Sequence, residues 1–171
     1  MIDLVTLATV TGIAPESAEP LALRCAIALQ RRHRPGVGLT CDMNGRTISE
    51  KLYLRGREHA TSAHEDWNRV TEEGAEAIAL MLASLHHSLR IKRRLQSRFS
   101  EGADWLLTNS VTGAKVVLEV GGTDEGDLGV LLSRKIAQAK RSPFATRGRA
   151  AACVVCFAEP EARLWSDDEP R

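Results

Sequence analysis

The chain has 171 residues, of which 43% are apolar and 26% are charged, and its formal net charge is +1. This length and composition are typical of one globular domain with a sizeable core, and they exclude wholesale disorder. A net charge near zero gives no overall attraction to nucleic acid or to a membrane, so a charged partner must be recognised by a local cluster.

No run of about 18 apolar residues is present, and no basic region precedes the short apolar stretch at the start of the chain. We therefore predict neither a membrane span nor export, and we expect a cytoplasmic protein.

The first part of the chain predicts a helix followed by a β-hairpin. The helix is expected to begin at Ser17 and to stop before Pro35. In residues 37–54, apolar side chains alternate on both sides of Asn44-Gly45, which is a strong signal for a two-residue hairpin turn.

A second helix is predicted to begin at Thr71, after residues 55–70, which have the polar composition of a loop. Thr71 is a suitable N-cap, and apolar side chains recur on one face of the helix after it. Glu73 and Glu76 lie on the opposite face, where we expect water to solvate both carboxylates.

The remaining elements predict a mixed sheet. Three strands are expected near residues 89–95, 103–108 and 116–120, then a helix over 125–141 and a strand over 150–157. A last strand that returns through a helix runs parallel to its neighbour. We predict a single α/β domain with a mixed central sheet flanked by helices: a core over 71–157, a helix and hairpin extension over 1–70, and a polar tail over 158–171.

Four polar residues lie where this pattern calls for apolar ones or at the edge of an apolar face. Asp104 begins the second core strand, Glu119 lies within the apolar third strand, and Lys135 lies inside the apolar arc of the following helix, with Gln138 at its rim. A buried carboxylate is costly unless it is paired, protonated or bound to metal. Two carboxylates and an ammonium at one end of the sheet would suit Mg²⁺ or Mn²⁺ and the charge of a phosphate.

Asp104, Glu119 and Lys135 also have a purely structural interpretation. Asp104 is equally consistent with a solvated residue where a turn becomes a strand, and Glu119 with Lys135 is consistent with a structural ion pair.

Basic side chains follow one another in the first core strand and just after it. Arg90, Lys92, Arg94 and Arg98 alternate along residues 90–98, where no acid interrupts them. They are consistent with a solvated strand face, and they are also candidates to bind the phosphate backbone of nucleic acid.

The element order and the acidic residues resemble the PD-(D/E)XK nuclease superfamily, which has the restriction-endonuclease-like fold. The resemblance covers residues 71–157 and implies an α-β-β-β-α-β core in which Asp104 and Glu119 bind Mg²⁺ or Mn²⁺. The family's lysine lies two residues after the second acid, and here that position is Gly121. Some branches carry the lysine on the following helix, and Lys135 with Gln138 resembles that arrangement. The resemblance also makes a homodimer plausible.

Three functions follow from these features. The first is a metal-dependent nuclease, or nuclease-like subunit, that cleaves DNA or RNA. The second is a non-catalytic module that keeps the fold and binds nucleic acid or a protein. The third is a small-molecule hydrolase built on the turn Gly121-Gly122-Thr123, which follows a strand and precedes a helix but lacks a phosphate-loop motif.

Overall fold

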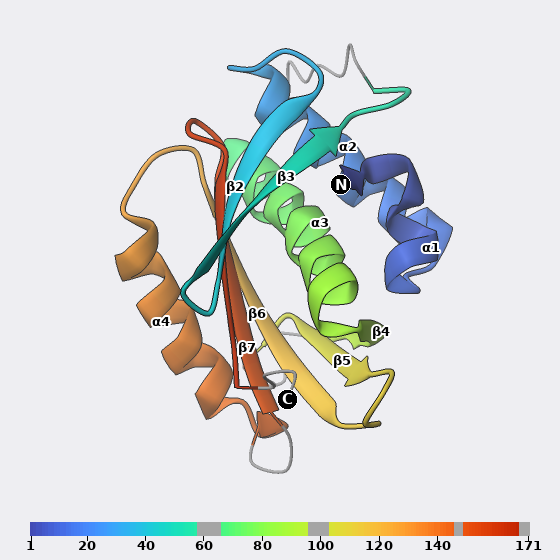
Figure 1. Ribbon diagram of the computed structural model, residues 1–171, viewed down its shortest axis with the longest axis vertical. Coiled ribbons are helices and arrows are strands. Elements are labelled where there is room, and N and C mark those ends of the chain that lie inside the picture. The colour runs from blue at the N-terminus through green and yellow to red at the C-terminus, as the bar shows by residue number, and fades with distance from the viewer. Residues whose placement is uncertain (58–65, 96–102, 146–148, 168–171) are drawn as a thin grey trace.

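The computed structural model describes residues 1–57, 66–95, 103–145 and 149–167 of the chain. Within these ranges, eight strands form one mixed sheet in the order β1-β3-β2-β8-β7-β6-β5-β4 (Figure 1). The strands are β1 Ile2–Asp3, β2 Val37–Met43, β3 Arg46–Tyr53, β4 Leu89–Arg94, β5 Trp105–Asn109, β6 Lys115–Thr123, β7 Arg149–Cys156 and β8 Glu161–Ser166.

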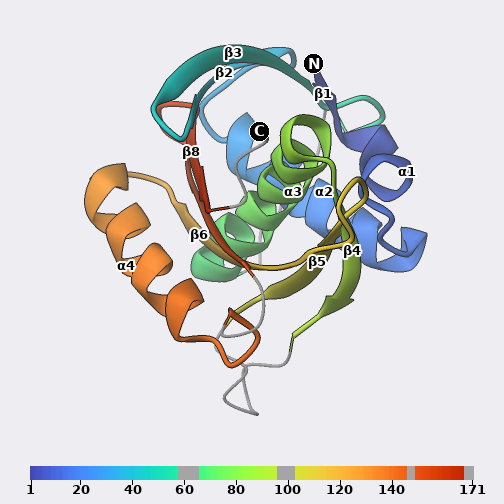
Figure 2. The same ribbon diagram turned by 60° about the horizontal axis from the view of Figure 1, so that its bottom comes forward.

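The sheet curls around its longest helix, Trp67–His87, and the helix Leu128–Arg141 covers the outer face (Figure 2). The described helices are η1 Leu4–Thr6, α1 Leu7–Thr11, α2 Pro15–Gln30, α3 Trp67–His87 and α4 Leu128–Arg141. Helix α3 packs against α2 and against β6, whereas α4 packs against β6 and β7 from the opposite face. None of the helices in the described part of the chain is long and apolar enough to cross a membrane.

The main core lies between α3 and the sheet. Helix α3 is buried over most of its length because the sheet covers one side of it and α2 covers another. Close packing needs glycine at two points. A Cβ on Gly74 would lie 3.1 Å from the Cα of Cys25 in α2, and one on Gly122 in β6 would lie 2.0 Å from the carbonyl oxygen of Thr71. The backbones of α3 and β6 therefore approach each other directly.

The order of elements from α3 to β7 agrees with the sequence analysis. Strands β4, β5 and β6 pair antiparallel, and β7 pairs parallel to β6 after the crossover through α4. The predicted hairpin is also confirmed, with Asn44 and Gly45 at positive φ in its turn (51° and 84°).

The prediction of a polar tail after residue 157 was wrong for residues 161–166, which form β8. This strand pairs antiparallel with β7 and parallel with β2. Its burial alternates, with Ala162, Leu164 and Ser166 inward, but six residues with so few apolar side chains are a weak strand signal. As a consequence, the hairpin and the core share one continuous sheet.

The first residues of α2 and α3 also differ from the predictions. Helix α3 begins at Trp67, where the side chain of Asp66 accepts a hydrogen bond from the amide of Asn68. Thr71 lies inside the helix, and its hydroxyl donates to the carbonyl of Trp67. Residues 58–65 of the predicted loop lie outside the described residues, and α2 begins at Pro15, two residues before the predicted start.

Candidate active site

Pairing of β5 with β6 brings the first two candidate residues together. The amide of Asp104 donates to the carbonyl of Leu118 at 3.2 Å, and the amide of Val120 donates to Oδ2 of Asp104 at 2.8 Å. The Asp104 carboxyl is therefore bound to the residue that directly follows Glu119. Along β6, Glu119 and Gly121 point toward α4, whereas Leu118 and Val120 belong to the core beneath α3.

Helix α4 brings the lysine to the same place. Nζ of Lys135 lies 2.8 Å from Oε1 of Glu119, and the two side chains are 16% and 1% exposed. Gln138, one turn further along α4, lies close enough to oppose the rise that burial causes in the pKa of the Glu119 carboxyl. The prediction that Lys135 faces the sheet is thus confirmed, and three elements contribute to one cluster.

Gly121 explains how the lysine reaches the sheet from a helix. A Cβ on Gly121 would lie 3.1 Å from Cε of Lys135 and 3.5 Å from both methyl groups of Leu131. A larger residue at this position in β6 would therefore fill the space that the lysine stem occupies. The glycine and the helical lysine are complementary in shape.

Burial dominates the electrostatics of the two carboxyls. Burial and the nearby Asp104 carboxylate raise the pKa of Glu119 to about 7, against the opposing effects of Lys135 and Gln138. Burial likewise raises the pKa of Asp104, and the Val120 amide and Lys135 oppose that rise. Oε2 of Glu119 is buried and has no hydrogen-bond partner among the described residues.

A third carboxyl, Glu76, lies near this cluster, and the prediction that water solvates it was wrong. Glu76 is only 6% exposed; Oε2 accepts from the indole of Trp105 at 3.0 Å, and Oε1 lies 2.8 Å from Arg94. Burial raises its pKa to about 7, Arg94 opposes the rise, and the Asp104 carboxylate adds to it. The prediction treated α3 as a helix with one buried face, but α2 and the sheet cover this helix on different sides, so that Glu76 is buried as well. The buried Trp105, whose N–H needs an acceptor, was the available signal.

The basic side chains of β4 do not project from one face as their alternation suggested. A β-bulge between Ile91 and Arg93 shifts the register, so that Arg90 lies opposite Thr108 and Arg94 opposite Trp105. The guanidinium of Arg90 donates to the carbonyls of Thr9 and Val10 at the end of α1. Lys92 is exposed at the bulge.

Arg94 pairs with Glu76 and lies 5.3 Å from the ring of Trp105. Arg98 lies outside the described residues.

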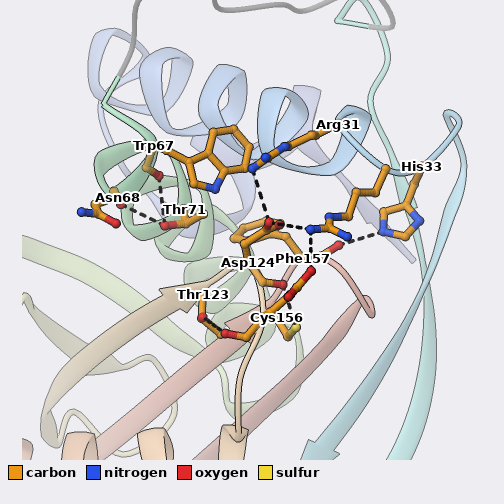
Figure 3. Close-up of polar contacts among 11 residues, drawn as sticks. Arg31, His33, Trp67, Asn68, Thr71, Thr123, Asp124, Cys156 and Phe157 are labelled. Atoms are coloured by element: carbon orange, nitrogen blue, oxygen red, sulfur yellow. Dashed lines mark hydrogen bonds and ion pairs between the residues drawn. The ribbon is translucent and has the colours of Figure 1, made fainter.

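The turn after β6 is occupied by contacts within the chain (Figure 3). Asp124 forms ion pairs with Arg31 at 3.3 Å and with Arg32 at 3.0 Å, both at the end of α2. The carbonyl of Thr123 accepts from the amide of Phe157, whose own carbonyl lies 2.8 Å from Nε2 of His33. These contacts fasten α2 to the ends of β6 and β7, and both arginines neutralise the carboxylate of Asp124.

Comparison of the chain with protein-family models, with curated proteins and with solved structures found no match. Among the residues that the structure describes, no group of three or more His, Cys, Asp or Glu side chains is arranged to hold a metal ion. The geometry of Asp104, Glu119 and Lys135 is therefore the main indication of a function in the described residues.

Proposed function

We propose that the chain is a metal-dependent nuclease, or a nuclease-like subunit, with a restriction-endonuclease-like core, and that it hydrolyses phosphodiesters in DNA or RNA. The observation that carries this proposal is the meeting of Asp104, just before β5, with Glu119 of β6 and Lys135 of α4 at one point of the sheet. The helix, three antiparallel strands, helix and parallel strand of residues 67–156 support it, because they have the order and pairing that the resemblance implies.

The residues present fit a hard divalent cation. Mg²⁺ binds one or two carboxylates and completes its shell with water and substrate phosphate, so a two-carboxylate site is sufficient. Asp104 and Glu119 would hold the ion, and the unpartnered Oε2 of Glu119 offers it an oxygen. When bound, Mg²⁺ or Mn²⁺ would polarise the scissile phosphate.

The protein's own groups have distinct roles in this proposal. The ammonium of Lys135 holds the Glu119 carboxyl in place and presents positive charge toward negative charge that develops on the phosphate. Gln138 supports the same carboxyl. Glu76 is a positioning residue, because its hydrogen bond to Trp105 and its ion pair with Arg94 fix the ends of β5 and β4 beside Asp104.

A second candidate is favoured by the burial of the pair. Glu119 is 1% exposed, as expected of a carboxylate in a structural ion pair. In that case the chain is a non-catalytic module that keeps this fold and binds nucleic acid or a protein.

Cleavage assays distinguish the two candidates. Plasmid, single-stranded DNA and RNA are incubated with Mg²⁺ or Mn²⁺ and the parent chain, Glu119→Ala, Lys135→Ala or the control Lys115→Ala, whose lysine is exposed at the start of β6. Each variant is first checked for folding by circular dichroism. The nuclease proposal expects metal-dependent cutting that falls about 100-fold to 1,000-fold in the two site variants and stays unchanged in the control.

The opposite result has an equally clear meaning. If the parent chain cuts none of the three substrates with either metal, and the site variants only lose stability, Glu119 and Lys135 are a structural pair. The binding module is then the better account.

A further inference from the structure

A basic groove lies between the start of α2 and β4, on the side of the sheet that faces away from α4. It has a volume of about 350 Å³ and is lined by the turn between α1 and α2, the first turns of α2, the second half of β4, and Trp105. Trp105 directly follows Asp104 in the chain, and the charge of Arg94, which also lines the groove, opposes the rise that burial causes in the pKa of the Asp104 carboxyl. The groove therefore borders Asp104 at the start of β5, whereas Glu119 and Lys135 face α4 on the other side of the sheet.

The floor of the groove is apolar. Ile13, Leu21 and Trp105 are 7%, 2% and 2% exposed, and Ile91 is half-buried beside them. The hydrogen bonds from Arg90 to the end of α1 hold β4 against this segment, so the groove is formed without a ligand. Such a surface suits a flat, weakly polar group.

The rim of the groove is positively charged. Lys92 and Arg93 lie at the β4 bulge, and the Arg94 side chain is 53% exposed despite its ion pair with Glu76. None of the described residues that line the groove is acidic. The groove therefore favours an anionic ligand. A planar or apolar part of the same ligand could cover the apolar floor.

We propose that this groove binds single-stranded nucleic acid, with an unpaired base on the floor formed by Ile13, Leu21 and Ile91 and its phosphates against Lys92 and Arg94. A duplex would offer phosphates to the rim but keep its bases stacked inside the helix, which leaves the floor uncovered. The inference deepens the proposed function by naming a substrate class. It rests on that proposal only for cleavage, because binding in the groove needs no metal.

The test measures binding in the absence of divalent metal. Fluorescence anisotropy with a short labelled DNA strand, and with the same strand in a duplex, is recorded in EDTA over a range of salt concentrations. The variants are Lys92→Ala and the control Lys51→Ala, which removes another exposed strand lysine, from β3 at the far side of the sheet. Both positions are exposed, so both variants should fold, and circular dichroism checks that they do.

The proposal expects tighter binding of the single strand than of the duplex. The slope of log K against log salt concentration is negative, and its magnitude should fall by about 0.7 in Lys92→Ala and stay unchanged in Lys51→Ala. Equal slopes in the two variants would overturn the groove as the binding site. Lys92-dependent binding that is as strong for the duplex, or for an acidic polypeptide, would overturn the single-strand assignment. Lys92-dependent binding without cleavage in Mg²⁺ would support the groove while the nuclease proposal fails.

Discussion

Burial of Glu119 makes the stability of the fold depend on pH. Its carboxyl is 1% exposed, and its pKa rises from an ordinary value of 4.5 to about 7 in the folded chain. A carboxyl with a higher pKa in the folded state holds its proton more tightly there than in the unfolded state. The free energy of unfolding therefore falls as pH rises through the interval from 4.5 to about 7. At about 1.4 kcal/mol per pH unit, the loss between pH 5 and pH 8 is roughly 2 to 3 kcal/mol.

Glu119→Gln isolates this effect because the amide keeps the size of the side chain but cannot ionise. Parent and variant are unfolded with urea at pH 5 and pH 8 in EDTA, with circular dichroism as the signal. The parent should lose roughly 2 to 3 kcal/mol more than the variant over this range. Groups such as Glu76 are present in both chains and largely cancel in the difference. If the two chains show the same pH dependence, Glu119 is ionised throughout and Lys135 fully compensates for its burial.

Three further predictions concern packing and turns, and urea unfolding checks each of them. Gly122→Ala should lower the free energy of unfolding by about 3 kcal/mol or more, because its Cβ would lie 2.0 Å from the Thr71 carbonyl oxygen. Gly121→Ala should lower it by less than about 1 kcal/mol, because its Cβ would lie 3.1 Å from the flexible end of a lysine. Equal losses in the two variants would contradict the close approach of α3 to β6. Gly45→Ala should cost about 1 kcal/mol, because φ is 84° in the hairpin turn, and an unchanged midpoint would contradict this strain. Phe157→Ala should cost about 3 to 5 kcal/mol because the ring is fully buried; a smaller cost would mean that the site collapses around the missing ring.

Local patterns in the sequence predicted the parts of the fold that depend on local chemistry. Asn44-Gly45 identified the hairpin, and the apolar run around Glu119 identified the central strand β6. The position of Lys135 on a helical wheel was enough to direct it to the sheet, because α4 has a single buried face. These predictions needed only the periodicity of one element at a time.

The predictions failed where the environment of an element comes from distant parts of the chain. Glu76 is buried because Trp105 and Arg94 lie against α3, and neither contact is visible in the helix's own periodicity. Residues 161–166 form a strand because they can pair with both β2 and β7. The bulge after Ile91 shifts the register of β4, so that its basic side chains do not all lie on one face. Tertiary contacts therefore overrode local patterns at these places.

The position of β8 between β2 and β7 has a consequence for how the chain folds. β8 follows in sequence both of the strands that it joins, and its parallel pairing links Thr40 to Glu161 and Met43 to Leu164. Contacts of such long sequence separation slow folding because a large loop must close first. During synthesis, the edge of β2 stays unpaired until residues 161–166 have left the ribosome, and an unpaired edge invites aggregation. The hairpin of β2 and β3 is therefore exposed to aggregation until β8 pairs with it.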